Sequence, residues 1–229
     1  MNRKSILIAL VVCSFALTAV VAQATPINLT AAPASASAEF DASPWGYPYP
    51  GYYNAAQAFD GNLGPDGPKD GTNCGHRWVP GGTPAWIMVD LGADYSLNNV
   101  KISWESGYST NYTLGIRSSL DGPSGAYATI ATIVTRSGTV GHGNTSGTWT
   151  YDETFDFTTG SVTLTTGAAA SKSANLGATG RYLMLNSTSG GSVVWEIQVD
   201  GTVIPEPSTL VLLAAGLVGL LCYAWRKRR

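Results

Sequence analysis

The sequence of 229 residues has only three cysteines, two histidines and few basic residues away from its two ends. Cys13 and Cys222 lie in apolar runs near the ends, which leaves Cys74 alone in the middle of the chain. Cys74 is therefore either a buried thiol or an intermolecular link, because it has no partner for an internal disulfide. His76 and His142 lack the spacing of zinc ligands, and no nucleophile-elbow motif accompanies either. These absences favour a protein that is not an enzyme.

Positive charge is scarce in the middle of the chain. Residues 25–203 hold seven Lys and Arg against 14 Asp and Glu, a net charge of −7, whereas the whole chain has a formal charge of −2. Binding to nucleic acid needs basic side chains at the phosphates, so the sequence argues against a nucleic-acid partner. The acids Asp152, Glu153 and Asp156 are close in sequence, but adjacent acids on a polar strand are typical of a solvated face. We therefore do not expect the carboxylate pair of a glycosidase here.

Both ends resemble addressing signals and lie outside the expected fold. Near the start, two basic residues precede an apolar run over 6–21, and Ala22-Gln23-Ala24 has the small-x-small pattern of a signal-peptidase site. We expect a signal peptide over 1–24. At the other end, Leu210 to Trp225 is apolar and four basic residues follow at 226–229. The length fits a transmembrane helix over about 208–225, with the basic tail in the cytoplasm and residues 25–203 outside the membrane.

Period-two alternation of apolar and polar residues predicts an all-β domain in the middle of the chain. Alternation is clear over 86–91, 100–105 and 112–117, weaker over 127–134, and clear again over 181–186 and 193–200. Trp86, Trp104 and Trp195 are expected in the core or at its edge. Strand-like pieces occur at 154–157 and 161–165 within a stretch that is rich in Thr, Ser, Gly and Ala. About eight short strands without a long amphipathic helix predict an antiparallel jelly-roll β-sandwich.

The stretch before the clear strands has a different composition. Residues 25–34 form a small, polar lead-in, and the residues after them are expected to form a first strand. Residues 39–53 are crowded with aromatics and carry three prolines within seven positions, which excludes a central strand or a helix. We expect an aromatic loop there. Residues 54–59 then predict a short helical turn leading into Asp60-Gly61-Asn62.

The order of short motifs in this middle region resembles the discoidin family. That family is also called the coagulation factor V/VIII type C domain, and it is close to the family 32 carbohydrate-binding modules of the galactose-binding-like fold. The likeness covers about residues 35–202. The motifs that carry it are Ala-Phe-Asp-Gly-Asn (58–62), Arg-Trp (77–78), Trp-Ile-Met-Val-Asp-Leu-Gly (86–92), Val-Lys-Ile-Ser-Trp-Glu (100–105), Tyr-Thr-Leu (112–114), Ser-Ser-Leu-Asp-Gly (118–122), Arg-Tyr-Leu-Met-Leu (181–185) and Trp-Glu-Ile-Gln-Val-Asp-Gly (195–201).

The resemblance implies a structural calcium ion. Its oxygen ligands would come from Asp60, Asn62, Thr72, Glu196 and the carbonyl of Trp195, and oxygen ligands are what Ca²⁺ requires. The sequence departs from the family pattern because residues 63–71 intervene before Thr72. This insertion rebuilds, enlarges or abolishes the site. The alternative is that residues 60–62 form only a turn.

The resemblance also implies glycan binding through loops at one end of the sandwich. Sugar rings stack on exposed aromatic side chains while polar groups fix their orientation. The aromatic loop offers Trp45, Tyr47 and Tyr49 as a platform, and the candidate polar or stacking partners are Glu105, Tyr108, Arg117 and His142. The alternative is that the aromatic side chains of this loop pack against the end of the sandwich.

The C-terminal tail resembles the PEP-CTERM sorting signal of bacteria. The matching features are Pro205, Glu206 and Pro207, the apolar run that follows and the terminal basic cluster. This resemblance implies processing by an exosortase, a membrane-embedded sorting enzyme, and placement at the cell surface or in the extracellular matrix. The alternative is a membrane anchor that stays attached.

Two functions remain open from the sequence. The first is an exported module that binds extracellular polysaccharide or another glycan without catalysis. The second is a structural matrix protein that has no specific glycan ligand and carries attached sugar in its Ser- and Thr-rich region, 135–180.

Overall fold

The computed structural model describes residues 24–40, 53–61, 77–82, 84–104, 109–121, 125–137, 151–165, 167–190, 193–205 and 209–227. The expected signal peptide, Cys74 and most of the aromatic loop lie outside these residues. The strands are β1 (Thr25–Pro26), β2 (Ala34–Ala36), β3 (Ala85–Trp104), β4 (Ser109–Arg117), β5 (Ala128–Ser137), β6 (Tyr151–Asp156), β7 (Ser161–Leu164), β8 (Ala168–Ala174), β9 (Thr179–Gly190) and β10 (Val194–Val203). The helical elements are η2 (Ala55–Phe59), η3 (Ser119–Asp121) and α2 (Thr209–Lys227).

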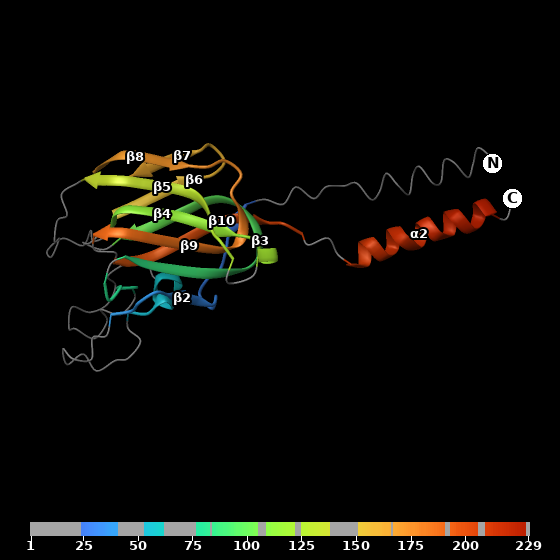
Figure 1. Ribbon diagram of the computed structural model, residues 1–229, viewed down its shortest axis with the longest axis horizontal. Coiled ribbons are helices and arrows are strands. Elements are labelled where there is room, and N and C mark those ends of the chain that lie inside the picture. The colour runs from blue at the N-terminus through green and yellow to red at the C-terminus, as the bar shows by residue number, and fades with distance from the viewer. Residues whose placement is uncertain are drawn as a thin grey trace.

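The strands form two antiparallel layers that share β3 (Figure 1). The first half of β3 pairs with β2 and β9, and β9 continues the layer through β4 and β5 to β8. The second half of β3 pairs with β10 on one side and with β6 on the other, and β1 and β7 complete that layer. The predicted antiparallel jelly-roll sandwich is therefore confirmed.

The apolar residues of the predicted alternation point into the space between the layers. Ile87, Val100 and Leu114 are examples, each exposed by 1% or less. The core also contains Trp78, Trp104, Tyr112, Phe155, Leu183, Leu185, Ile197 and Val199. Trp86 differs from the expectation: it alternates with Ile87 on β3, so its ring lies on the outer surface with 36% of its area exposed.

Glu153 also differs from the sequence prediction, since it is buried rather than solvated. Its carboxylate lies 2.7 Å from Nε of the buried Arg136, and it accepts hydrogen bonds from Trp104 Nε1 at 2.9 Å and from the Tyr112 hydroxyl. Burial raises the pKa of Glu153 to about 8, while the bond from Trp104 acts in the opposite direction. The guanidinium of Arg136 favours the charged form as well. Asp152, by contrast, pairs with Lys101 near the surface at 2.7 Å.

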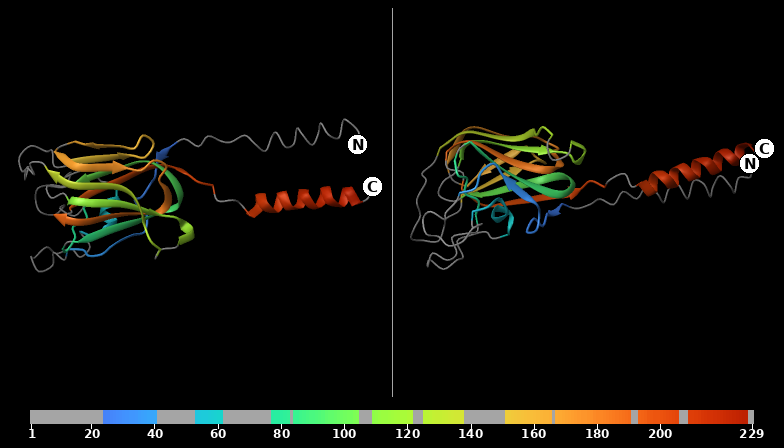
Figure 2. Two further views of the ribbon diagram at one scale, coloured as in Figure 1. Left: turned by 45° about the horizontal axis from the view of Figure 1, so that its top comes forward. Right: turned by 60° about the horizontal axis from the view of Figure 1, so that its bottom comes forward.

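The two ends of the sandwich differ in what they carry. At one end β3, β5 and β9 finish and β4, β6 and β10 begin, and we call it the loop end. At the other, the tail end, β1 begins and β10 finishes, with Thr25 opposite Gly201 (Figure 2). The lead-in thus belongs to the sheet from its first residues.

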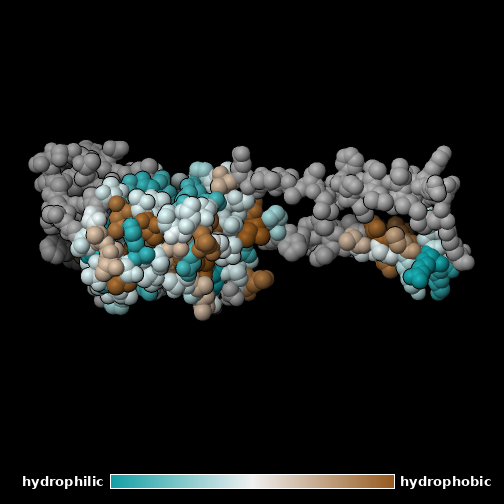
Figure 3. Space-filling model, turned by 90° about the horizontal axis from the view of Figure 1, so that it is seen from above, coloured by the Kyte–Doolittle hydropathy of each residue, from teal (hydrophilic) through white to brown (hydrophobic). Residues whose placement is uncertain are grey.

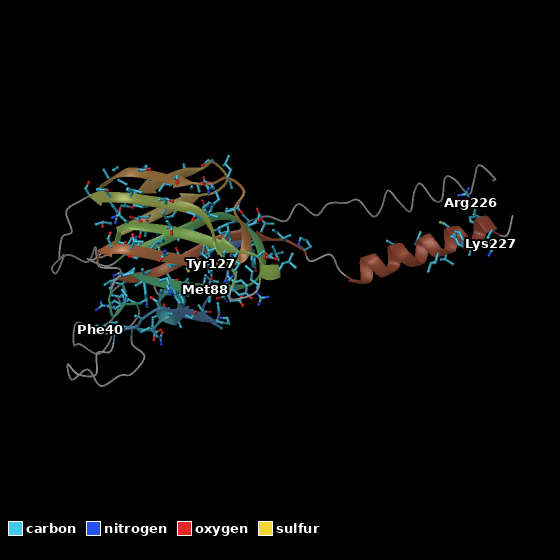
Figure 4. The ribbon with its side chains drawn as sticks, viewed as in Figure 1. Phe40, Met88, Tyr127, Arg226 and Lys227 are labelled. Carbon is cyan, nitrogen blue, oxygen red and sulfur yellow. The ribbon has the colours of Figure 1, made fainter. Side chains whose placement is uncertain are left out.

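The C-terminal tail contains a helix, as predicted. Helix α2 spans Thr209–Lys227 and ends with Arg226 and Lys227 in its last turn (Figure 4). Within the part of the chain that the structure describes, however, no helix has both the length and the apolar character needed to cross a membrane. The expected transmembrane segment is therefore not supported.

Candidate functional site

Two of the residues that were predicted to bind calcium, Asp60 and Glu196, meet where η2 packs on β10. Asn54 caps η2 by accepting a hydrogen bond from the Gln57 N–H, and the chain then reaches Asp60 and Gly61. The Gly61 N–H donates to Glu196 Oε1 at 3.3 Å, which joins this corner to β10. Asp60 and Glu196 are thus brought together as predicted, whereas Asn62 and Thr72 lie outside the described residues.

Glu196 is buried because η2 and residues 26–30 cover the outer face of β10. The alternation of apolar and polar residues along β10 predicted that Glu196 is exposed to solvent, yet only 3% of Glu196 is exposed. Burial raises the pKa of Glu196 to about 8, the negative charge of Asp60 adds to this, and the Gly61 N–H opposes it. Glu196 Oε2 has no hydrogen-bond partner among the described residues. A buried carboxylate oxygen without a hydrogen-bond partner destabilises the folded state unless a proton or a cation binds to it.

A cavity of about 240 Å³ adjoins this carboxylate. Its lining includes Thr30, Phe59, Gly61 and Glu196, together with the neighbouring part of β10. Among the described residues, no group of three or more His, Cys, Asp and Glu side chains gathers around one point. The described part of the site therefore supplies two carboxylates, those of Asp60 and Glu196.

A cluster of aromatic side chains around Arg77 lies next to this corner, at the loop end. The Arg77 guanidinium carbon lies 5.2 Å from the centre of the Tyr53 ring and 5.1 Å from that of Trp195. Phe40 makes an edge contact with Tyr53, with the ring centres 5.9 Å apart, and 39% of Phe40 is exposed (Figure 4). Sequence reasoning used Arg77 only as part of a family motif and did not propose it as a site residue.

Trp195 is adjacent to both features because β10 has a bulge there. Val194 pairs with Trp104 and Glu196 pairs with Ser103, so Trp195 is the extra residue on its strand. A bulge of this kind redirects the side chains around it. It brings Trp195 against Arg77 while Glu196 turns toward η2. Trp195 is buried, as predicted, and its Nε1 has no hydrogen-bond partner among the described residues.

The predicted glycan-binding residues fall into two groups. Six of them lie outside the described residues, namely Trp45, Tyr47, Tyr49, Glu105, Tyr108 and His142. The described residues on either side of these six, such as Phe40 and Tyr53, or Trp104 and Ser109, are at the loop end. Arg117 is described, and it lies elsewhere. It is at the far end of β4, on the outer face of the sheet, where it is buried under Tyr127 and Tyr182.

Comparison with known families identifies the fold. Residues 57–185 match the family described as the NedA-like, galactose-binding domain, and this match spans more than half of the chain. The chain belongs to this family. Residues 203–229, beyond the galactose-binding domain, match the PEP-CTERM protein-sorting motif. Both resemblances that the sequence suggested are confirmed, and the sorting motif implies an exported protein associated with the cell surface.

Solved structures with a similar fold include three sugar-binding proteins. Chitosan-binding module 2 from a chitosanase/glucanase of Paenibacillus sp. IK-5, in complex with chitotriose, is 20% identical, with 75% of this chain and 98% of that chain covered and a TM-score of 0.45. The family 32 module of C. perfringens NanJ, in complex with galactose, is 16% identical, with coverage of 78% and 99% and a TM-score of 0.45.

The third is a fucolectin from striped bass, Morone saxatilis, which is 16% identical to this chain, with 80% of this chain and 52% of that chain covered and a TM-score of 0.44. At these identities the likeness concerns the fold and carries no argument about the ligand. No curated protein matches the chain in sequence.

Proposed function

We propose that this chain is an exported protein that binds carbohydrate without catalysis and is delivered to the cell surface or extracellular matrix by an exosortase-type enzyme. The observation that carries the proposal is the presence of two matches in one chain. Residues 57–185 match a galactose-binding domain, and residues 203–229 match a protein-sorting motif. A binding domain followed by a sorting motif needs no catalytic site of its own.

The loop end is the proposed glycan site. Because the rings of Phe40 and Tyr53 are in contact, the aromatic stretch that contains Trp45, Tyr47 and Tyr49 starts and finishes at one place. That place is beside Arg77 and Trp195. Aromatic rings beside a fixed polar group are what a sugar needs, since its C–H faces stack and its hydroxyls form hydrogen bonds.

Two further stretches complete the proposed site. Glu105 and Tyr108 connect Trp104 to Ser109, and His142 lies between Ser137 and Tyr151, so the chain enters and leaves both stretches at the loop end. These residues supply the carboxylate, hydroxyl and imidazole groups that fix the orientation of a sugar. Arg117 is not part of this proposed site.

A structural calcium ion fits the corner between η2 and β10. The orphaned Oε2 of Glu196 and the nearby Asp60 are the support for this proposal. Both carboxylates would hold the ion together with Asn62, Thr72 and the Trp195 carbonyl, and oxygen donors of this kind suit Ca²⁺. The ion would neutralise the two carboxylates and tie the start of the 62–76 segment to the strand that carries Trp195.

A glycan array tests the proposal. The full chain is applied to immobilised plant, animal and bacterial glycans, and binding to at least one structural class is expected. The variants Trp45→Ala and Tyr108→Ala are expected to abolish the signal, and Leu176→Ser, at the opposite end of the domain, serves as the matched control. Silence across the whole array would instead favour a structural matrix protein.

A further inference from the structure

The tail end of the domain exposes a group of aliphatic side chains. Leu120 on η3 is 95% exposed and Leu176 is 68% exposed, and the ends of β10 and of the described tail add Val203 and Ile204. Among the described residues of the β domain, the only other exposed aliphatic side chain of this size is Val134 on β5. Seen from above, hydrophobic residues lie at the end of the domain from which the chain leaves (Figure 3).

One short segment of β3 fixes the position of all four side chains. The Asp94 carboxylate accepts hydrogen bonds from the Ser119 N–H and hydroxyl, which places η3, and its backbone carbonyl accepts from the Ile204 N–H at 2.8 Å. Three residues later the Leu97 N–H donates to the Ala178 carbonyl at 2.9 Å, which places the turn that carries Leu176. Tyr95 is opposite Val203. The segments that carry the four side chains are therefore all anchored to residues 94–97 at the tail end, and we call the surface that carries them the tail-end surface.

The tether between this surface and helix α2 is short. Ile204 is the last residue held to the sheet, by Asp94, and α2 begins at Thr209. Five steps of extended chain span at most about 18 Å. The first residue of α2, Thr209, therefore lies within about 18 Å of Ile204, so a partner that holds the start of α2 is held near the tail-end surface.

Helix α2 itself needs a partner. Val218, Leu220, Leu221 and Tyr223 are each more than half exposed, and an apolar surface of this kind marks an interaction site. The match to a protein-sorting motif over 203–229 indicates what that partner does. A single partner that binds the Pro205-Glu206-Pro207 motif and the start of α2 is therefore brought beside the tail-end surface, because Pro205 directly follows Ile204.

We propose that the tail-end surface is a docking surface for the sorting enzyme, so that the enzyme recognises the folded domain as well as its tail. This proposal rests on the proposed sorting function. Exposed aliphatic side chains of Leu120, Leu176, Val203 and Ile204 supply apolar contact, and folding of the domain is what gathers them. An unfolded chain would present the tail without this surface, so the sorting step selects folded domains.

Pulse labelling in the host tests this proposal. The full chain is produced in cells that contain the sorting system, and the half-time for removal of the tail is measured by gel shift and intact mass. Leu120→Ser is the main variant because an almost fully exposed side chain contributes little to folding. We expect it to lengthen the half-time at least threefold, and the triple variant with Leu176→Ser and Ile204→Ser to lengthen it further. Val134→Ser, the matched control, keeps the wild-type half-time.

A longer tether provides a second measurement. Ten Gly and Ser residues inserted between Ile204 and Pro205 leave the Pro205-Glu206-Pro207 motif and the residues after it unchanged but release the domain from its fixed distance. The insertion is expected to slow processing as much as Leu120→Ser does, and the two changes together are expected to add nothing. A wild-type rate for the insertion would contradict the tether argument.

The outcomes separate the two proposals. Pro205→Ala with Pro207→Ala is expected to stop processing. If this variant stops processing while the triple variant is processed at the wild-type rate, the docking surface is ruled out and the sorting function stands. If neither change has any effect, the sorting function itself is wrong.

Discussion

Gly61 donates its N–H to the Glu196 carboxylate across 135 positions of sequence, at 3.3 Å, and this contact joins the η2 corner to β10. It holds a buried carboxylate next to Asp60 without neutralising it. The charge of Asp60 disfavours the charged form of the buried Glu196, so a proton or a cation at this carboxylate is favourable. The stability of this corner should therefore depend on both pH and calcium.

For the metal-free chain we expect stability to fall as pH rises. The pKa of Glu196 is raised from 4.5 to about 8 in the folded chain, so the folded state binds more protons than the unfolded state between these values. The Glu196 contribution is fully present below pH 4.5 and is lost as pH rises through 8. Thermal melts in EGTA measure this, and Glu196→Gln should reduce the dependence to the part that Glu153 contributes, since the pKa of Glu153 is also raised to about 8. A melting temperature that does not change between pH 5 and 8 would argue against a buried acid here.

Calcium should reverse this trend. The ion binds the charged carboxylates, so its effect grows with pH. At 100 times its Kd it stabilises by about 2.7 kcal/mol. In a domain of this size that amounts to a rise in melting temperature of about 5–11 °C. Glu196→Gln should remove the effect, while Asp152→Asn, which changes a surface acid, should keep it. Equal midpoints with calcium and with EGTA at pH 8 would remove the ion from this account.

The buried pair of Arg136 and Glu153 should tolerate joint replacement better than single replacement. Arg136→Met leaves the Glu153 carboxylate buried without its cation and should cost about 3–5 kcal/mol. The double variant Arg136→Met, Glu153→Leu should recover part of that loss, because it removes the buried charge but leaves Trp104 Nε1 and the Tyr112 hydroxyl without their acceptor. Lys101→Ala, which breaks the surface pair with Asp152, should cost at most about 1 kcal/mol. Urea unfolding of the three variants tests this ordering, and a double variant no more stable than Arg136→Met would contradict it.

Gly115 provides room for Tyr127 on the outer face of the sheet. A Cβ atom at position 115 would lie 2.9 Å from Tyr127 Cβ. The Tyr127 hydroxyl reaches Met88 and accepts from Arg117, so Gly115→Ala displaces a ring that covers a buried cation (Figure 4). Overpacking of this kind costs about 1–3 kcal/mol. Gly82→Ala, with nothing within 4 Å, is the control in the same urea series. Equal stability of the two variants would show that the ring moves freely.

The sequence predicted most of the strands because their inner faces are consistently apolar. It predicted two strands over 86–105, whereas the structure has one, β3. Gly92, which lies between the two predicted strands, has φ of +87° and lets the strand bend without ending. Strand β8 was missed because Ala168–Ala174 is polar, mostly exposed and at an edge, so no alternation marks it.

The site was harder to predict than the fold because its key contacts are between distant strands. Glu153 is next to other acids in sequence, and its burial depends on Arg136 from another strand. Glu196 was predicted as a ligand from family resemblance alone, since nothing in the alternation of β10 indicates that residues 26–30 cover its outer face. Arg117 ends a well-predicted strand, but sequence does not show at which end of the sandwich that position lies.

The most direct test of the account is a titration of the full chain with a soluble fragment of the glycan that gives the strongest array signal. The account predicts saturable binding, a Kd raised at least tenfold by Trp45→Ala and by Tyr108→Ala, and a Kd unchanged by Leu176→Ser. Binding that survives both loop substitutions, or no saturable binding to any glycan, would contradict a carbohydrate site at the loop end.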